Sequence, residues 1–85
     1  MKVSLVYFAW VRERIGKSSE ELELPDTVQT VGELLDYMKT LGEEYEMALE
    51  HDRVIRVAIN QEHADYDEPI AGAREIGIFP PMTGG

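Results

Sequence analysis

The segment Thr30–Gly42, "TVGELLDYMKTLG", decides the fold because it carries the strongest helix signal in the chain. Thr30 is followed three residues later by Glu33, which is the spacing of a capping box, where each side chain bonds a free backbone N–H group of the other residue. Apolar residues then recur along one helix face, at Val31, Leu34, Leu35, Met38 and Leu41. Glycine favours the end of a helix, so we predict one main helix that ends at Gly42.

The segments before this helix are predicted to be two strands and a short helix. Val3–Phe8 is rich in β-branched and aromatic residues on both faces, which is typical of a central strand. "AWVRERIG" predicts a short helix that ends at Gly16. Glu20–Leu24 alternates between charged and apolar residues and stops before Pro25, which predicts a second strand, antiparallel to the first.

The segments after the main helix predict two more strands. Glu44–His51 is a weaker helical candidate, Arg53–Asn60 and Arg74–Pro80 are strands, and Asn60–Pro69 is a turn-rich loop with room for a short strand. The order is therefore strand, strand, helix, strand, strand. One main helix packed across a mixed sheet predicts the α+β class, with a ubiquitin-like β-grasp as the leading topology.

Composition narrows the functional classes. The chain has 85 residues, enough for one domain with a modest core, which favours a binding or carrier module over a self-sufficient enzyme. It has 8 Lys and Arg against 17 Asp and Glu, so its net charge of -9 disfavours nucleic acid and favours a basic partner. It has no cysteine, which suits a cytoplasmic protein, and the apolar stretch "VSLVYFAWV" is too short to span a membrane.

No catalytic or metal-binding motif emerges from the side chains. The sequence lacks a glycine-rich phosphate loop, so it cannot activate a substrate with ATP unaided. His51 and His63 lack metal-ligand spacing, and Asp65, Asp67 and Glu68 lack the glycine and distal glutamate of a calcium loop. No serine has a histidine partner at a recognisable spacing. We therefore expect no intrinsic metal, no bound cofactor and no catalytic side chain.

The last eight residues, Ile78–Gly85 or "IFPPMTGG", provide a different candidate. They divide the chain into a domain of residues 1–80 and a tail of residues 81–85, which reaches at most ~16–18 Å when extended. Gly84 and Gly85 have no Cβ, so the tail can thread a narrow channel and its terminal carbonyl stays open to attack. A carboxylate is a poor electrophile, so we expect a separate ATP-using enzyme to activate Gly85 as an acyl-adenylate. The alternative is a frayed and inert end.

Three blocks of the sequence carry a family resemblance. They are "YFAWVRERIG" at residues 7–16, "VAINQ" at residues 57–61 and "EIGIFPPMTGG" at residues 75–85. Together they resemble the small-subunit family of molybdopterin synthase, within the ubiquitin-like sulfur carriers. The chain departs from that family before its last strand, where an acidic D-G-D-E segment is replaced by Gly72-Ala73-Arg74-Glu75.

The resemblance implies a role for the tail and for one surface of the domain. Gly85 would be adenylated by an activating enzyme and converted to a thiocarboxylate. Pro81, Met82, Thr83 and Gly84 would insert into the large subunit of a heterotetramer, where the sulfur passes to cyclic pyranopterin monophosphate.

The partner-binding surface is likewise implied by the resemblance alone. Phe8 and Phe79 match family positions on the face that meets both the activating enzyme and the large subunit, with Arg12 as a nearby charged contact. The alternative is that both rings belong to the core. Three alternatives stay open at this stage. They are a sulfur carrier for thiamine or another pathway, a protein modifier conjugated to lysines through Gly85, and an interaction module with an inert tail.

Overall fold

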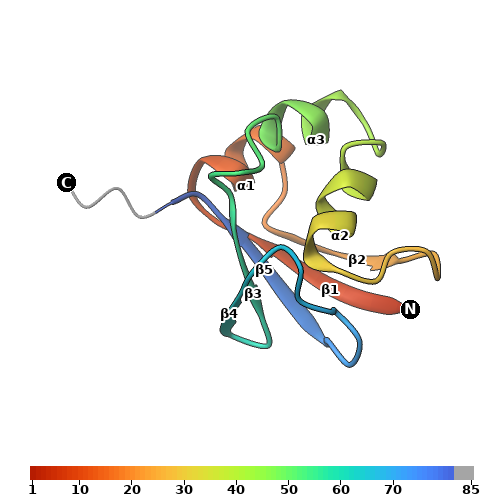
Figure 1. Cartoon of the computed structure of the whole chain (residues 1–85). Coiled ribbons are helices and arrows are strands. Elements are labelled where there is room, and N and C mark those ends of the chain that lie inside the picture. Colours follow the sequence, from red (N-terminus) through yellow and green to blue (C-terminus); the bar gives the residue numbers. More distant parts are fainter. Residues whose placement is uncertain (82–85) are drawn as a thin grey trace.

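The computed structural model describes residues 1–81 of the 85-residue chain. In this part of the chain the elements are β1 (Lys2–Tyr7), α1 (Ala9–Ile15), β2 (Ser19–Glu23), α2 (Val31–Met38), α3 (Glu43–Ala48), β3 (Arg56–Ile59), β4 (Glu62–Ala64) and β5 (Glu75–Phe79). The strands form one sheet in the order β2–β1–β5–β3–β4 (Figure 1). None of the helices within residues 1–81 is long and apolar enough to cross a bilayer.

The sheet is mixed, with its parallel pair in the interior. β1 and β5 run parallel, with Leu5 beside Ile76 and Tyr7 beside Ile78. β2 pairs antiparallel with β1, as predicted, and β3 pairs antiparallel with both β5 and β4. Because β1 and β5 run in the same direction, their C-terminal ends lie at the same end of the sheet.

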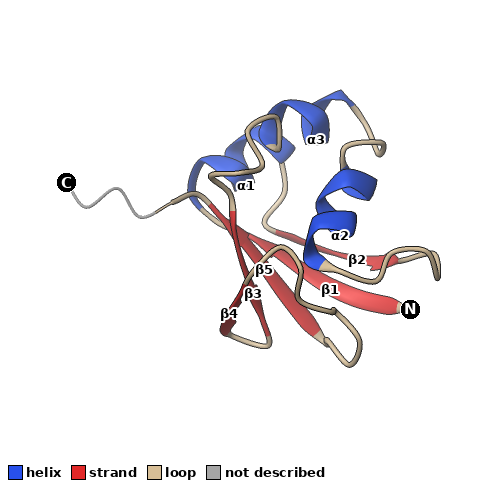
Figure 2. Ribbon diagram, viewed as in Figure 1, coloured by secondary structure: helices blue, strands red, loops and turns tan. Residues whose placement is uncertain are grey.

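All three helices lie on one face of the sheet (Figure 2), and the core fills the space between them. Successive side chains of a strand point to opposite faces, so alternate residues of each strand enter this core. The buried strand residues include Val3, Leu5, Tyr7, Val57, Ile76 and Ile78, and α2 contributes its apolar stripe of Val31, Leu34, Leu35 and Met38. Within residues 1–81 no charged side chain is buried.

Two predicted helix boundaries are confirmed by their hydrogen bonds. At the start of α2, the Glu33 N–H donates to Thr30 Oγ1 at 3.2 Å and the Thr30 N–H donates to Glu33 Oε1 at 3.1 Å, which completes the capping box. At the end of α1, Gly16 takes a left-handed φ of 90° and its N–H donates to the Arg12 carbonyl at 2.8 Å. Glycine adopts this conformation without steric cost.

The predicted end of the main helix is wrong. α2 ends at Met38 rather than at Gly42, and the chain then tightens into a turn in which the N–H groups of Thr40 and Leu41 donate to the carbonyls of Tyr37 and Met38 at 3.0 Å each. The Thr40 hydroxyl also donates to the Tyr37 carbonyl, at 2.6 Å. Leu41 still packs against the core, and Gly42 is the residue before α3. The apolar spacing predicted which residues are buried, but it did not predict the turn that ends the helix after Met38.

The strand predicted at Arg53–Asn60 is also shorter than expected. The residues before β3 form a turn, in which the N–H groups of Val54 and Ile55 donate to the carbonyls of His51 and Asp52 at 3.0 and 3.1 Å. The turn leaves Val54 43% exposed.

The start of β5 is held by Asn60. The two-residue hairpin between β3 and β4 consists of Asn60 and Gln61, whose φ angles of 50° and 73° are those that a tight hairpin turn requires. Asn60 Oδ1 accepts hydrogen bonds from the N–H groups of Arg74 and Glu75 at 2.9 and 3.1 Å. The segment that departs from the family pattern, residues 72–75, is thus attached to the hairpin at its end, and Gly72 at its start has a φ of 83° in the turn before β5.

A hydrogen-bonded cluster ties α3 to β1 and β2. The hydroxyls of Tyr7 and Tyr45 both donate to Glu20 Oε2 at 2.6 Å, and Lys17 Nζ donates to Glu20 Oε1 at 3.2 Å. Burial raises the pKa of Tyr7, and its bond to Glu20 raises it further. Burial also acts to raise the pKa of Glu20, but the bonds from Tyr45, Tyr7 and Lys17 outweigh it and lower that pKa overall.

Candidate functional site

The strand alternation that builds the core places two phenylalanines on the opposite face of the sheet. Tyr7 and Ile78 are buried under the helices, so their neighbours Phe8 and Phe79 point the other way. Phe8 is 47% exposed, and Phe79 is half-buried. Their rings meet edge to face, with centroids 6.3 Å apart and an interplanar angle of 83°. This is a favourable geometry for an aromatic pair.

The backbone at the end of β1 fixes Phe8 in this position. Its N–H donates to the Ile78 carbonyl at 3.1 Å, which continues the pairing between β1 and β5 by one residue. Its own carbonyl accepts the N–H groups of Val11 and Arg12 at 3.1 and 3.3 Å, so Phe8 is also the first residue before α1. The sharp change of direction is completed by Ala9, whose φ is 53°.

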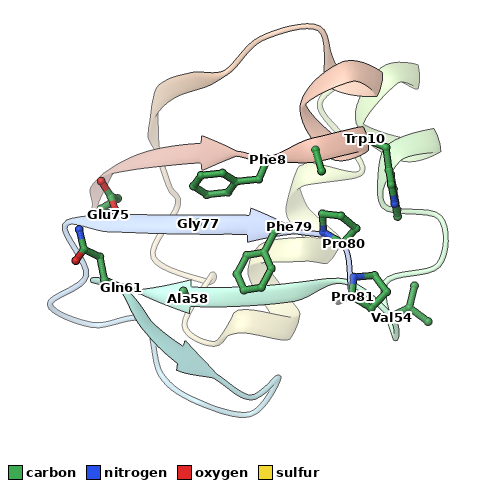
Figure 3. Close-up of a pocket in the computed structure, with 11 residues that line it drawn as sticks. Phe8, Trp10, Val54, Ala58, Gln61, Glu75, Gly77, Phe79, Pro80 and Pro81 are labelled. Carbon is green, nitrogen blue, oxygen red and sulfur yellow. The ribbon is translucent and has the colours of Figure 1, made fainter. Parts of the chain in front are cut away.

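Gly77 forms the floor beneath the Phe8 ring. A Cβ atom at this position would lie 3.3 Å from Phe8 Cε2, which is closer than most Cβ contacts. The absence of a side chain therefore lets the ring lie directly over β5, as Figure 3 shows. Ala58, the partner of Gly77 on β3, lines the same groove with only a methyl group.

These residues line an open groove of about 860 Å³, which we call the tail-exit groove. Glu75 and Gln61 lie at one end, and Trp10 and Val54 lie at the other (Figure 3). The remaining lining residues are mostly apolar: Phe8, Ala9, Ala58, Gly77, Phe79, Pro80 and Pro81. The groove thus presents a hydrophobic surface at the point where the chain leaves its last strand.

The predicted site residues fall into three groups. Phe8, Phe79 and Pro81 come together in the tail-exit groove. Arg12 is exposed on α1 and does not line the groove. The remaining predicted site residues, Met82, Thr83, Gly84 and Gly85, lie outside the described residues. The role of each in partner binding or sulfur transfer stays a prediction.

Sequence reasoning missed Trp10 and Val54, which close one end of the groove. Trp10 was visible as a third aromatic residue in the block that contains Phe8, since the sequence there is "YFAW". Val54 had no such signal, because its exposure depends on the turn before β3.

The histidines and acidic side chains do not gather into a metal site in the part of the chain that the structure describes. Within residues 1–81 no group of three or more His, Asp or Glu side chains is placed to hold a metal ion. His51 and His63 are both exposed. The groove itself offers hydrophobic contact and one carboxylate, Glu75, which suits protein recognition.

A mixed five-stranded sheet with helices on one face and an apolar groove at the exit of its last strand defines a ubiquitin-like β-grasp protein of the α+β class. Residues 5–85 match the ThiS family model, and the chain belongs to the ThiS family. The predicted fold is thereby confirmed.

Curated relatives match over the full length of the chain. The molybdopterin synthase sulfur carrier subunit of Escherichia coli (strain K12) is 31% identical, over 98% of this chain and 99% of the relative. The protein of the same name in Dictyostelium discoideum is 36% identical, over 95% of this chain and 93% of the relative. These matches confirm the resemblance to the small-subunit family of molybdopterin synthase.

Solved structures share the fold. A protein of Pyrococcus furiosus superimposes with a TM-score of 0.72 at 28% identity, over 96% of this chain and 99% of that chain. The small archaeal modifier protein 1 of Haloferax volcanii superimposes with a TM-score of 0.72 at 27% identity, over 95% of this chain and 98% of that chain. The second name is that of a protein modifier, whereas the curated relatives are named as sulfur carrier subunits. Proteins named for either function therefore share this fold.

Proposed function

We propose that this protein is the sulfur carrier subunit of a molybdopterin synthase. The observation that carries the proposal is the full-length match to curated sulfur carrier subunits, at 31% identity over 98% of the chain in the E. coli case. The tail-exit groove supports it, because it supplies a docking surface beside the last described residue, Pro81. We place this activity in the cytoplasm.

The chemistry takes place at Gly85 and is performed by partner enzymes. The Gly85 carboxylate attacks the α-phosphate of ATP in an activating enzyme, which releases pyrophosphate and leaves an acyl-adenylate. Sulfide delivered by a donor then displaces AMP and leaves a thiocarboxylate. The carrier itself needs no ATP site, in keeping with the absence of a phosphate-binding loop from its sequence.

The large subunit of the synthase then receives the tail. Pro81, Met82, Thr83 and Gly84 lead Gly85 into its active site, where sulfur passes to cyclic pyranopterin monophosphate. The dithiolene product has two sulfur atoms, so two carriers are used for each product, as in a heterotetramer. Phe8 and Phe79 anchor the domain while the tail is inserted, and Arg12 adds a charged contact at the edge.

Deletion of Gly84 and Gly85 tests this function. The truncated protein should unfold at the same temperature as the full chain, because the core lies within residues 1–81. It should form no thiocarboxylate and support no molybdopterin synthesis when combined with the activating enzyme and the large subunit. If molybdopterin synthesis survives the deletion, the proposal is wrong.

A protein modifier is the second candidate, favoured by the likeness to small archaeal modifier protein 1. In that case Gly85 would form isopeptide bonds with lysines of other proteins. Digestion of cell proteins and mass spectrometry of branched Gly-Gly remnants separates the two functions. A sulfur carrier leaves no such remnants in cells whose molybdopterin synthesis is active.

A further inference from the structure

Gly77 lies in the middle of β5, a position where a glycine needs an explanation. Glycine weakens the interior of a strand relative to alanine, because it loses more conformational freedom on folding and packs no side chain. Gly77 does not take a left-handed φ, since the glycines that do so within residues 1–81 are Gly16 and Gly72. The backbone conformation of the strand is therefore not the reason for the missing side chain.

Contact with another part of the backbone is not the reason either. A Cβ atom at position 77 would lie 4.0 Å from the Ala58 carbonyl oxygen, which is an ordinary van der Waals distance. The close approach is to Phe8 Cε2, at 3.3 Å, where the ring would have to give way by a few tenths of an ångström. The bare backbone of Gly77 therefore accommodates the ring of Phe8.

The backbone of Phe8 has little freedom to relieve such a contact. Its N–H donates to the Ile78 carbonyl, and its own carbonyl accepts N–H groups from α1, so the residue is held by β5 on one side and by α1 on the other. A side chain at position 77 would therefore displace the ring by rotation about its side-chain torsions. Such a rotation would change the edge-to-face contact with Phe79, whose ring centroid lies 6.3 Å away.

The ring that rests on Gly77 is also a large part of the exposed apolar surface of the groove. Phe8 is 47% exposed, so the contact with β5 leaves much of the side chain open to a partner. In Figure 3 the ring of Phe8 lies on the β1 side of β5, and the ring of Phe79 lies on the β3 side. The position of the Phe8 ring over Gly77 thus sets the shape of the tail-exit groove.

We propose that Gly77 is a positioning residue for the docking of the large synthase subunit, an inference that rests on the proposed function. Gly77 lets the Phe8 ring lie low against β5, in the position in which the partner's apolar surface covers it. Loss of side-chain freedom at an interface is one of the costs of association, and a ring that is already in place loses less of it. Gly77 acts through Phe8 and makes the groove ready for binding.

The alternative is that the contact between Phe8 and Gly77 serves only the sheet, since an aromatic ring packed on a strand glycine can stabilise the strand. The two explanations predict losses in different measurements. A purely structural contact affects the unfolding of the protein, whereas a positioning contact affects the binding of the large subunit and depends on the presence of the ring.

Gly77→Ala tests the proposal, with binding of the purified large subunit to the full chain measured by isothermal titration calorimetry. The variant should weaken binding about fivefold, because the displaced ring must be ordered again when the partner binds. Its unfolding temperature should change by less than about 4 °C, since the better strand propensity of alanine offsets the lost ring packing. In a Phe8→Ala background, Gly77→Ala should change binding by less than about twofold, because no ring is left to displace.

Gly32→Ala is the matched control. A Cβ atom at position 32 would also lie 3.3 Å from its nearest neighbour, the Tyr66 carbonyl oxygen, but Gly32 lies in α2 and does not line the tail-exit groove. This variant should bind the large subunit as the unaltered chain does. Phe8→Leu is a second test that leaves β5 unaltered, and it decides the question if Gly77→Ala does not fold. It keeps an apolar side chain but removes the ring that rests on Gly77, so it should weaken binding about tenfold.

Two outcomes overturn the positioning role. In the first, Gly77→Ala or Phe8→Leu binds the large subunit as tightly as the unaltered chain does. In the second, Gly77→Ala weakens binding equally with and without the Phe8 ring, so that its effect does not pass through Phe8. Failure of the proposed function is distinguishable from both, because the large subunit would then not bind the unaltered chain.

Discussion

The two faces of the sheet are built from the same strands, but helices cover only one of them. On the helix-covered face, Leu5, Ile76 and Leu34 are fully buried, and the hydroxyl of Tyr7 is bonded to Glu20. On the open face, Phe8 is 47% exposed over Gly77, and no helix within residues 1–81 covers it. The side chains of the covered face are buried by other parts of the same domain, whereas the open face leaves hydrophobic area that a partner can bury.

The covered face should therefore determine the stability of the domain, and the open face should determine how it binds a partner. Residues of the covered face determine whether the domain folds, because each is packed on all sides. Residues of the open face can be changed at small cost to folding, and their effect should appear when a partner binds.

The largest effect is expected at the covered face. Leu34→Ala should lower the free energy of unfolding by about 2–5 kcal/mol, because it leaves a cavity under α2. Phe8→Ala should lower it by less than about 1 kcal/mol, because the ring is already half in solvent. Urea unfolding of both variants measures the contrast, and equal losses would show that Phe8 belongs to the core after all.

The next effect is expected at the open face, in binding. Phe8→Ala should weaken binding of the large subunit by about 2 kcal/mol, since an aromatic side chain at the centre of an apolar groove is a typical energetic anchor. Arg12→Ala should weaken it less, because Arg12 is exposed outside the groove. Isothermal titration calorimetry compares them, and a larger loss for Arg12→Ala contradicts the assignment of the groove as the main contact.

Much of this difference between the faces could be predicted from the sequence. The capping box located the start of α2, and the apolar spacing after it predicted which residues of that helix are buried. Both faces of Val3–Phe8 are apolar in the sequence, so only the family resemblance placed Phe8 and Phe79 on a partner-binding face. The tail motif and the aromatic pair were likewise visible in the blocks that carry the family resemblance.

The rest depends on contacts between segments that are distant in sequence. The tail-exit groove combines α1, the turn before β3 and the end of β5, so no local pattern could show that Trp10 and Val54 share it. At the end of α2, backbone bonds to Tyr37 and Met38 and a hydroxyl bond from Thr40 form a turn, and none of these bonds is visible in the apolar spacing.

A smaller effect on the stability of the fold is expected from the carboxylate of Glu20, which bonds Tyr7 and Tyr45. The folded protein lowers the pKa of Glu20, so this carboxylate stabilises the fold above its unfolded pKa of about 4.3. That stabilisation is lost as the pH falls through the lower, folded pKa. Glu20→Gln should therefore flatten the acid side of a stability profile measured by urea unfolding at several pH values.

The control for this prediction is Glu62→Gln on β4. Glu62 is exposed and takes part in none of the ion pairs of residues 1–81, so the variant should keep the acid dependence of the unaltered chain. An acid profile for Glu20→Gln that matches the unaltered chain would mean that the cluster of Tyr7, Glu20 and Tyr45 carries no charge-linked stability.

The smallest effect is expected at the hairpin between β3 and β4. Gln61 has a φ of 73°, which glycine adopts more readily, so Gln61→Gly should stabilise the fold by a few tenths of a kcal/mol to about 1 kcal/mol. Differential scanning calorimetry should show a small rise in Tm. A fall would indicate that the Gln61 side chain, at one end of the tail-exit groove, contributes to folding as well.

The central claim is that Gly85 carries sulfur, and the intact mass of the protein tests it most directly. Protein isolated from its native cell during molybdopterin synthesis should contain a fraction whose mass has increased by the replacement of one oxygen by sulfur. Fragmentation should place that change on Gly85. An unmodified C-terminus in all of the protein, under conditions where the pathway is active, would contradict the account.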